Sequence, residues 1–400
     1  MEREKQMTSS RLTRFTFSAH FYFILFGMGG FFPLLSTYFL KDAGLNGTQI
    51  GAILSLGPII MVFAQPLWGL LCDTTQRSKQ VLMGTTFFTG LSGLGYLINN
   101  DYGWMLGIAA ILAVFQAALV PISDSLAMSY VQREGGDYGK LRLWGAVGFA
   151  SAAYFIGEWA ENSGLMVIFI GFAGAMTLSA VTASLLPRER VSFDIDLRTG
   201  LSRLMKLPQF PLFLMGTFFV FGPIQANNVY FGLLIQDLGG TLAGVGIGFL
   251  LAAGSEAPVM RFASKWISRR GLLSVVIFAS LVSAARWLFY GYEPSVAWVY
   301  ITTVSQGLSV GLFIPAALQY VQDIAPKEVK TTAIALYTAA GTGLGNWFFS
   351  LLGGVIFDHF GIYSTYLFFG ISTLCGVGMV LWVQRLDRKS ESSLERSSVR

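Results

Sequence analysis

The sequence predicts an all-α polytopic membrane protein with twelve membrane-spanning helices, arranged as two pseudo-symmetric six-helix bundles. Three observations lead to this prediction: the chain is unusually apolar, its apolar stretches recur at span length, and its basic residues follow a topological pattern. Of its 400 residues, 54% are hydrophobic and only 12% are charged, whereas soluble domains carry about 25% charged residues. A soluble chain of this size could not bury so much apolar surface.

Stretches free of Asp, Glu, Lys and Arg mark the expected spans, because about 20 apolar residues cross a hydrocarbon core of about 30 Å. Six lie in each half of the chain, bounded by Arg14–Lys41, Asp42–Asp73, Lys79–Asp101, Asp101–Asp124, Arg142–Glu158, Glu161–Arg188, Lys206–Asp237, Asp237–Glu256, Arg270–Arg286, Glu293–Asp323, Lys330–Asp358 and Asp358–Arg385. The stretches that end at Asp124, Arg142, Glu256 or Arg286 are short. We therefore expect these four charges to lie within the membrane.

A long hydrophilic segment with five basic residues separates the two halves. We expect an N-terminal bundle over 1–186, a linker over 187–209, a C-terminal bundle over 210–386 and a tail over 387–400. With the N-terminus inside, all of the 27 Lys and Arg residues except Lys41 and Arg286 fall in or around inner segments. Because Lys and Arg concentrate in cytoplasmic loops, both termini and the linker are expected on the cytoplasmic side of a plasma or inner membrane.

The sequence gives no indication of an enzyme or a metal site. Cys72 and Cys375 are far apart, and His20 and His359 are isolated, so neither a disulfide framework nor a metal site is expected. No GxSxG, HExxH, P-loop or dinucleotide-binding motif occurs in a suitable context. We therefore expect no enzymatic activity and no cofactor. The net charge of +5 is interpreted as membrane topology, with no nucleic-acid partner.

The segment WGLLCDTTQRSK at 68–79 lies between the second and third expected spans and resembles the signature loop of the major facilitator superfamily. In it Gly69 would allow close helix contact, Asp73 would face a helix N-terminus or a basic partner, and Arg77 would face the cytosol. The functional interpretation is a salt-bridged latch that stabilises one conformation of alternating access. The alternative is a solvated basic loop that only fixes topology.

Three further stretches resemble lactose-permease-like members of that superfamily. They are MGGFFPLL at 28–35 with QPLWGLLCD at 65–73, PISD at 121–124 with YGKLRLWGAVGF at 138–149, and FSLLGG at 349–354 with FG at 360–361 and YL at 366–367. The middle stretch also resembles phenylpropionate permeases and nucleoside:proton symporters. The resemblance spans both halves and implies the major facilitator fold, with a substrate site near mid-membrane. Because these groups share a fold but carry different solutes, the resemblance does not show which solute this chain would transport.

Residue by residue, the resemblance implies a site that uses charges from both halves. Asp124 matches a carboxylate that accepts sugar hydroxyls, and Arg142 matches its arginine partner. Phe149 matches an aromatic ring that stacks on the sugar, and Glu256 matches a second substrate-binding carboxylate. Arg286 matches an arginine associated with proton release.

The cost of membrane charges supports this interpretation independently. A charge near the bilayer centre costs roughly 2.5–3.5 kcal/mol by insertion scales, so it persists where it is paired or lines a watery cavity. Asp124 and Arg142 could neutralise each other, and Glu256 and Arg286 form the analogous pair. Alternatives remain: a purely structural ion pair for Asp124 and Arg142, snorkelling to the interface for Arg286, and ordinary packing for Phe149.

The chain departs from lactose permeases at their proton-coupling positions. Where they carry His and Glu on the tenth span, this chain has Gln306 and Ser309. A proton symporter needs a carboxylate in the membrane that binds and releases protons near neutral pH, and Asp124 and Glu256 remain as candidates. We assign the proton to Glu256, with Asp124 held ionised by Arg142. Uniport, or coupling to another ion, stays open.

The function that follows is secondary active transport by alternating access: proton-coupled uptake of an oligosaccharide, a nucleoside or an aromatic acid. Asn227 fits a family position and would bind substrate or join helices. The alternative is efflux of drugs or metabolites, although the fifth expected span lacks the Pro of export-type motifs. A third hypothesis is a transporter-like membrane sensor. We expect a monomer whose partners are the solute, protons and the lipid bilayer.

Overall fold

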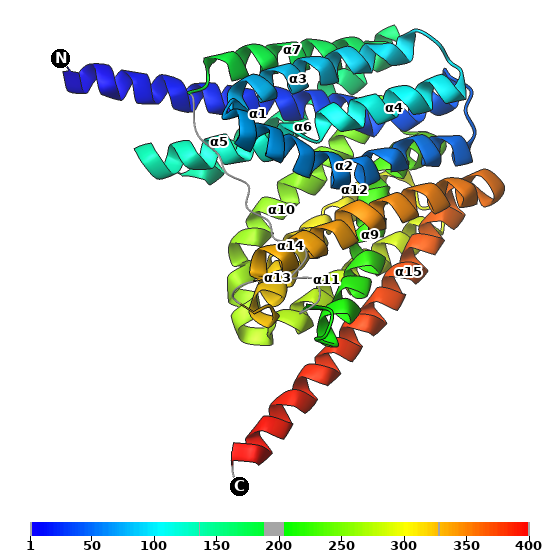
Figure 1. The fold of residues 1–400 in the computed structure, drawn as a ribbon. Helices are drawn as coiled ribbons and strands as arrows, with labels where there is room; N and C mark the ends of the chain where they lie inside the picture. Colours follow the sequence, from blue (N-terminus) through cyan, green and yellow to red (C-terminus); the bar gives the residue numbers. More distant parts are fainter. Residues whose placement is uncertain (1, 136, 188–203, 327–328, 399–400) are drawn as a thin grey trace. The chain divides into compact units, whose positions relative to one another are not determined.

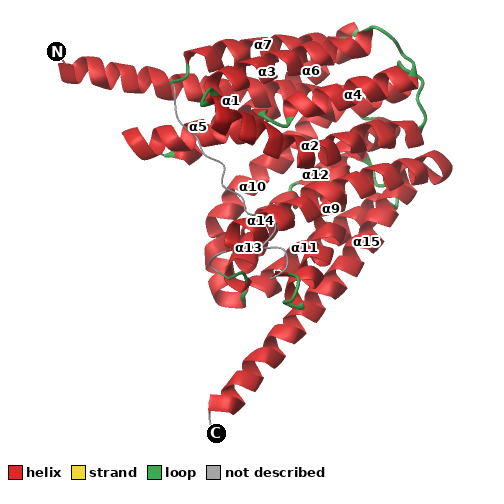
Figure 2. Cartoon of the chain, viewed as in Figure 1, coloured by secondary structure: helices red, strands yellow, loops and turns green. Residues whose placement is uncertain are grey.

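The computed structural model describes residues 2–135, 137–187, 204–326 and 329–398. Within these ranges every regular element is helical (Figures 1 and 2). The elements are α1 (Glu2–Lys41), α2 (Gly47–Thr75), α3 (Ser78–Leu94), η1 (Gly95–Leu97), α4 (Tyr102–Gln116), α5 (Leu119–Glu134), α6 (Tyr138–Ser163), α7 (Val167–Leu185), α9 (Gln209–Asp237), α10 (Leu242–Arg270), α11 (Leu272–Tyr290), α12 (Val296–Thr303), α13 (Gln306–Ile324), α14 (Lys330–Thr338), η3 (Ala339–Gly345) and α15 (Asn346–Ser398). The all-α prediction is confirmed, whereas most of the predicted linker lies outside the described residues.

Nine helical stretches of the described chain are long and apolar enough to cross a membrane. The last, Thr332–Arg388, has 57 residues and is interrupted at Gly361, where φ is 83°, a conformation that favours glycine. It therefore contains two spans. Two more helices fall just short of the length or the hydropathy of these nine stretches. The helix α3 has only 17 residues, and α6 carries Arg142 among other charges. With them, the helices of the described ranges account for the twelve predicted spans.

The chain forms two compact units. The first comprises Met1–Asp194 and Asn228–Leu250, and the second comprises Ile195–Asn227 and Leu251–Arg400. Each of α9 and α10 thus contributes one end to each unit. The predicted domain boundaries were drawn from hydrophilic segments and stay a prediction. Toward the C-terminus, α15 continues as a helix through Ser398, into the segment assigned to the tail.

Glycines set the spacing between α1 and α6 in the first unit. A Cβ added to Gly29 would lie 2.3 Å from the carbonyl oxygen of Phe149, and one added to Gly148 would lie 2.3 Å from that of Tyr22. Small residues let membrane helices approach this closely. This approach places α1 beside the helix that carries Arg142.

We expect Gly148→Ala to destabilise the protein by about 1–3 kcal/mol, because the new methyl group meets backbone that cannot move aside. The matched control is Gly107→Ala on α4, where an added Cβ has nothing within 4 Å. Thermal unfolding in detergent checks both variants. A Gly148→Ala protein as stable as the Gly107→Ala protein would contradict the close α1–α6 contact.

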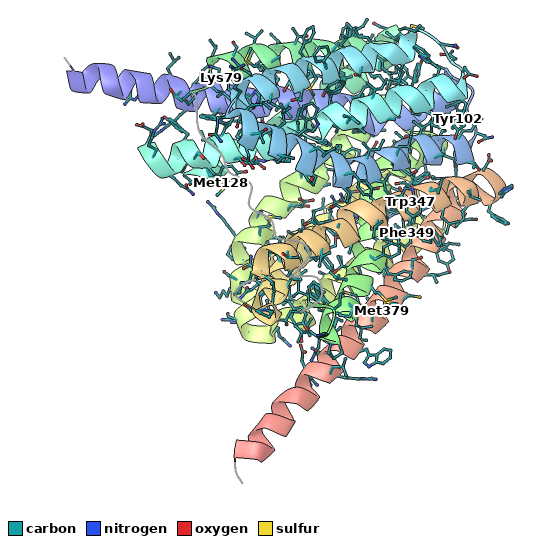
Figure 3. All side chains as sticks on the ribbon, viewed as in Figure 1. Lys79, Tyr102, Met128, Trp347, Phe349 and Met379 are labelled. Carbon is teal, nitrogen blue, oxygen red and sulfur yellow. The ribbon has the colours of Figure 1, made fainter. Side chains whose placement is uncertain are left out.

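In the second unit, α10 meets α13 at Gly307. Its N–H donates to the Ser255 hydroxyl at 2.9 Å, and an added Cβ would lie 2.3 Å from the Ser255 carbonyl oxygen. The fully buried Phe349 of α15 is part of an aromatic core with Phe218 and Phe368 (Figure 3). The contact at Gly307 holds together α10 and α13, two of the three helices that carry the buried polar residues of this unit.

Figure 3 also places Lys79 and Tyr102 at opposite ends of the first unit. Lys79 lies at the start of α3 and Tyr102 at the start of α4. Successive loops therefore lie at opposite ends of the bundle, as the alternating pattern of basic residues requires.

Candidate functional site

Each unit contains a cluster of polar side chains among its apolar helices. In the first unit, Nε of Arg142 on α6 lies 3.4 Å from Oδ1 of Asp124 on α5, and the two side chains are 32% and 30% exposed. The hydroxyl of Tyr138, one turn before Arg142, donates a hydrogen bond to the Asp124 carboxylate. Asp124 and Arg142 thus lie within ion-pair distance, as their opposite signs suggested. Both side chains keep part of their surface accessible to a solute.

Phe21 of α1 contacts Arg142 of this pair, and the preceding residue, His20, contacts Ser123 beside Asp124. The Phe21 ring lies 5.4 Å from the Arg142 guanidinium, within cation–π range. His20 is fully buried; its Nε2 lies 3.0 Å from the Ser123 hydroxyl, and its Nδ1 lies 3.1 Å from the Ser179 carbonyl oxygen. Sequence reasoning treated His20 as isolated, because nothing in the sequence shows which polar groups two distant helices bring to it.

Phe149 follows Arg142 by two helical turns and is half-buried. Its ring lies 5.9 Å from that of Phe249 in an edge-on arrangement, and Phe249 in turn lies 5.4 Å from Phe231. The ring therefore has packing partners of its own. Stacking of Phe149 on a sugar stays a prediction.

The cluster in the second unit is a chain of three side chains from three helices. Nη2 of Arg286 on α11 donates to Oε1 of Gln306 on α13 at 3.0 Å, and Nε2 of Gln306 donates to Oε1 of Glu256 on α10 at 3.0 Å. The described side chains show no direct ion pair between Glu256 and Arg286, which corrects the predicted pairing. The amide can stand between the two charges because one end accepts and the other donates.

Arg286 itself is only 4% exposed. Its guanidinium lies 4.3 Å from the centre of the Trp287 ring. Snorkelling of this arginine to the membrane interface is therefore wrong. One turn further on, the Tyr290 and Thr303 hydroxyls lie 3.0 Å apart, so the polar region continues between α11 and α12.

Asn227 of α9 is 6% exposed and accepts a hydrogen bond from the Tyr366 hydroxyl at 2.8 Å. The Tyr366 ring lies 5.8 Å from Trp287, which connects Asn227 through aromatic side chains to the surroundings of Arg286. The contact joins α9 to α15 in the way that polar residues link membrane helices. A role for Asn227 in substrate binding stays a prediction.

The residues of the predicted latch surround one tight turn between α2 and α3. Gly69 is buried, Asp73 is half-buried and Arg77 is exposed. Gln76 adopts a left-handed conformation with φ 52° and ψ 32°, and its N–H donates to the Cys72 carbonyl. This turn reverses the chain within two residues and holds the acidic and basic side chains at one end of the first unit. The latch itself stays a prediction.

Comparisons with known proteins agree with this architecture. Residues 16–368 match the MFS_1 like family. The chain is 44% identical over 373 residues to a maltose permease of Geobacillus stearothermophilus, covering 93% of this chain and 95% of the relative. It is 22% identical to a raffinose permease of Escherichia coli, covering 90% and 89% of the two chains. Its fold matches the crystal structure of the nucleoside transporter NupG with a TM-score of 0.83 and 15% identity, covering 93% and 98% of the chains.

The agreement extends over nearly the whole chain in sequence and in fold. A twelve-span helical protein whose relatives are permeases is itself a multi-pass membrane transporter. The chain belongs to the MFS_1-like family of the major facilitator superfamily.

Proposed function

We propose that the protein is a proton-coupled importer of a small neutral oligosaccharide, with maltose-like disaccharides as its substrate class. The observation that carries the substrate class is the 44% identity to a maltose permease along almost the full length of both chains. The likeness to NupG, at 15% identity, concerns the fold alone, so nucleoside uptake has no comparable support.

The Asp124–Arg142 pair suits a neutral, hydroxylated solute. The carboxylate accepts hydrogen bonds from sugar hydroxyls, and the guanidinium offers a planar fork of donors to sugar oxygens. Each side chain retains about a third of its surface, which is room for such contacts. Because the pair is neutral as a whole, a neutral sugar leaves the charge balance of the site unchanged, whereas an anionic solute would add an unbalanced charge.

In the same proposal, Glu256 of the second unit binds the transported proton. Glu256, Gln306 and Arg286 form a hydrogen-bonded series. Because Gln306 cannot titrate, protonation of Glu256 changes the charge at the Glu256 end of the series and nowhere else in it. The carbonyl oxygen of a protonated Glu256 would still accept from the Gln306 amide, so the contact persists while its charge disappears. Arg286 then loses the negative charge that faces it through the amide, and this imbalance links the proton to the transport cycle.

We also propose that both termini lie in the cytoplasm, since this places almost all Lys and Arg residues on one side. In that orientation Gly69, Asp73 and Arg77 form the inner latch, which would be closed in one conformation of the cycle and open in the other.

A ligand panel tests the substrate class. We expect maltose, at about 100 times its Kd, to stabilise the detergent-purified protein by roughly 2.7 kcal/mol, while uridine and 3-phenylpropionate leave thermal unfolding unchanged. Uptake of labelled maltose into proteoliposomes with an imposed proton gradient tests the coupling. Stabilisation by uridine or phenylpropionate but not by any disaccharide would overturn the proposed substrate.

A further inference from the structure

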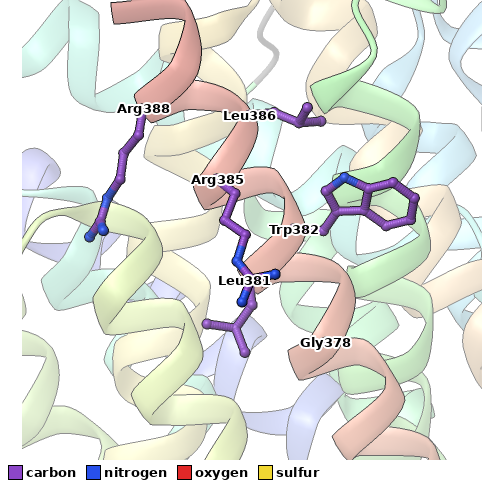
Figure 4. A pocket seen from close by; sticks show the side chains of 6 residues that line it. All are labelled: Gly378, Leu381, Trp382, Arg385, Leu386 and Arg388. Carbon is purple, nitrogen blue, oxygen red and sulfur yellow. The ribbon is translucent and has the colours of Figure 1, made fainter. Parts of the chain in front are cut away.

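One face of α15 carries a stripe of exposed side chains at the end of the last span. The stripe borders an open pocket of about 660 Å³, lined by Gly378, Leu381, Trp382, Arg385, Leu386 and Arg388 (Figure 4). Most of these positions recur every three or four residues, so they share one face of the helix. Trp382 is 60% exposed, and both arginines are exposed as well.

The opposite face of the helix is firmly packed at the same level. Val383 is fully buried. Nε2 of Gln384 donates to the Ser274 hydroxyl on α11 at 2.9 Å, and the Asp387 carboxylate accepts from the Tyr320 hydroxyl on α13 at 2.9 Å. These contacts fix the rotation of α15 about its axis, so the stripe is held outward by the structure.

The two arginines lack an acidic partner among the side chains that the structure describes. The ion pairs found there join Arg133 to Glu134 and Arg142 to Asp124, and Asp387 faces Tyr320 on the packed side. Two neighbouring guanidinium groups beside an exposed tryptophan are typical of the boundary between hydrocarbon and headgroups. Among the described side chains, these two exposed guanidinium groups are thus open to an anion that approaches from the lipid side.

Toward the hydrocarbon, the stripe becomes apolar and recessed. A Cβ added to Gly378 would have nothing within 4 Å, and Leu381 lies next along the face. Figure 4 shows the Arg385 side chain lying back along the helix toward Leu381, with Trp382 on one side and Arg388 on the other. A pocket with an apolar wall at Gly378 and Leu381 and two arginines beside it offers contacts to an acyl chain and to a phosphate, which arginine binds in bidentate fashion.

We propose that this stripe is a binding site for an anionic phospholipid. The lipid phosphate is held by Arg385 and Arg388, one acyl chain follows Gly378 and Leu381, and the Trp382 ring marks the level of the headgroup. A lipid with net negative charge is favoured over a zwitterionic one because two cations meet a single phosphate. The site is independent of the transported solute.

Titration of the delipidated protein in detergent with phosphatidylglycerol or phosphatidylcholine tests the proposal, with bound lipid counted by native mass spectrometry. We expect one tight phosphatidylglycerol per chain and weaker phosphatidylcholine. Arg385→Gln/Arg388→Gln should weaken phosphatidylglycerol binding by about tenfold or more, since each basic residue near a membrane surface attracts anionic lipid appreciably. Gly378→Leu fills the acyl groove without a change in charge and should also weaken binding.

The matched control is Arg269→Gln/Arg270→Gln, which removes the same charge from the exposed end of α10 and should leave the affinity unchanged. Equal loss in this control would mean general electrostatic attraction and would overturn the site. Equal binding of phosphatidylglycerol and phosphatidylcholine would also overturn the site. So would wild-type affinity for phosphatidylglycerol in both Gly378→Leu and Arg385→Gln/Arg388→Gln. Maltose uptake is a separate measurement, so a failure of the transport proposal leaves this result unaffected.

Discussion

Arg142→Ala is expected to weaken maltose binding by about 100-fold and to reduce uptake accordingly. In the proposed site the guanidinium donates at least two hydrogen bonds to sugar oxygens. Charge-assisted hydrogen bonds contribute about 1.5 kcal/mol or more each, and two of them correspond to about two orders of magnitude in Kd. Arg142→Lys keeps the charge but loses the planar fork, so it should recover only part of the affinity. Equilibrium binding of labelled maltose in detergent measures both effects.

The same position also has a structural role, and a double variant separates the two roles. Arg142→Ala leaves the Asp124 carboxylate without its cation, which should cost about 2 kcal/mol of stability, less than a fully buried pair because both side chains are partly exposed. Asp124→Ala/Arg142→Ala removes both charges and should regain most of that stability. It should not regain maltose binding. Recovery of uptake in the double variant would show that the pair only joins α5 to α6.

Arg133→Ala is the matched control for this experiment. Arg133 pairs with Glu134 at 3.0 Å, but the two side chains are 52% and 44% exposed. Exposed ion pairs contribute about 0–1 kcal/mol, so neither stability nor maltose affinity should change measurably. A loss of affinity in this control as large as that in Arg142→Ala would mean that binding depends on net charge rather than on the Arg142 site.

The fold could be predicted from the sequence because a bilayer imposes a simple rule on helix length and charge. Spans of about 20 apolar residues and the distribution of Lys and Arg gave the number and alternation of the helices. The rule is weakest for α6, which carries several charges, and for α3, which is short; hydropathy alone misses both helices. They were assigned because Lys79–Asp101 and Arg142–Glu158 are stretches free of Asp, Glu, Lys and Arg, and the alternation of basic residues supported the count.

The candidate site could be predicted only in part. Asp124 and Arg142 have opposite signs on successive spans, and a pair of this kind is nearly forced by the cost of isolated charges in a membrane. The same reasoning paired Glu256 with Arg286, but it could not foresee that Gln306 stands between them. Side-chain polarity tells which residues need partners, whereas the rotation of each helix decides which partners they meet. His20 shows this most plainly, since its contacts come from α5 and α7.

Glu256→Gln is expected to abolish proton-driven accumulation of maltose while leaving exchange of internal for external maltose largely intact. The glutamine resembles a permanently protonated glutamate, and its carbonyl oxygen can still accept from the Gln306 amide that now lies 3.0 Å from Glu256. Exchange needs no net proton movement, so it should survive. Accumulation against a gradient requires a proton to bind and leave in each cycle, so it should fall to the level seen without a proton gradient.

Two further variants make the result specific to Glu256. Glu256→Asp keeps a titrating carboxylate and should retain part of the accumulation. Glu158→Gln removes an exposed carboxylate on α6 that accepts a hydrogen bond from Asn162 of its own helix, so it should behave like the wild type. Proteoliposomes with an imposed pH gradient report accumulation, and preloaded proteoliposomes report exchange. If Glu256→Gln accumulated maltose with undiminished dependence on the pH gradient, the transported proton would have to bind elsewhere, and Asp124 would be the carboxylate to examine next.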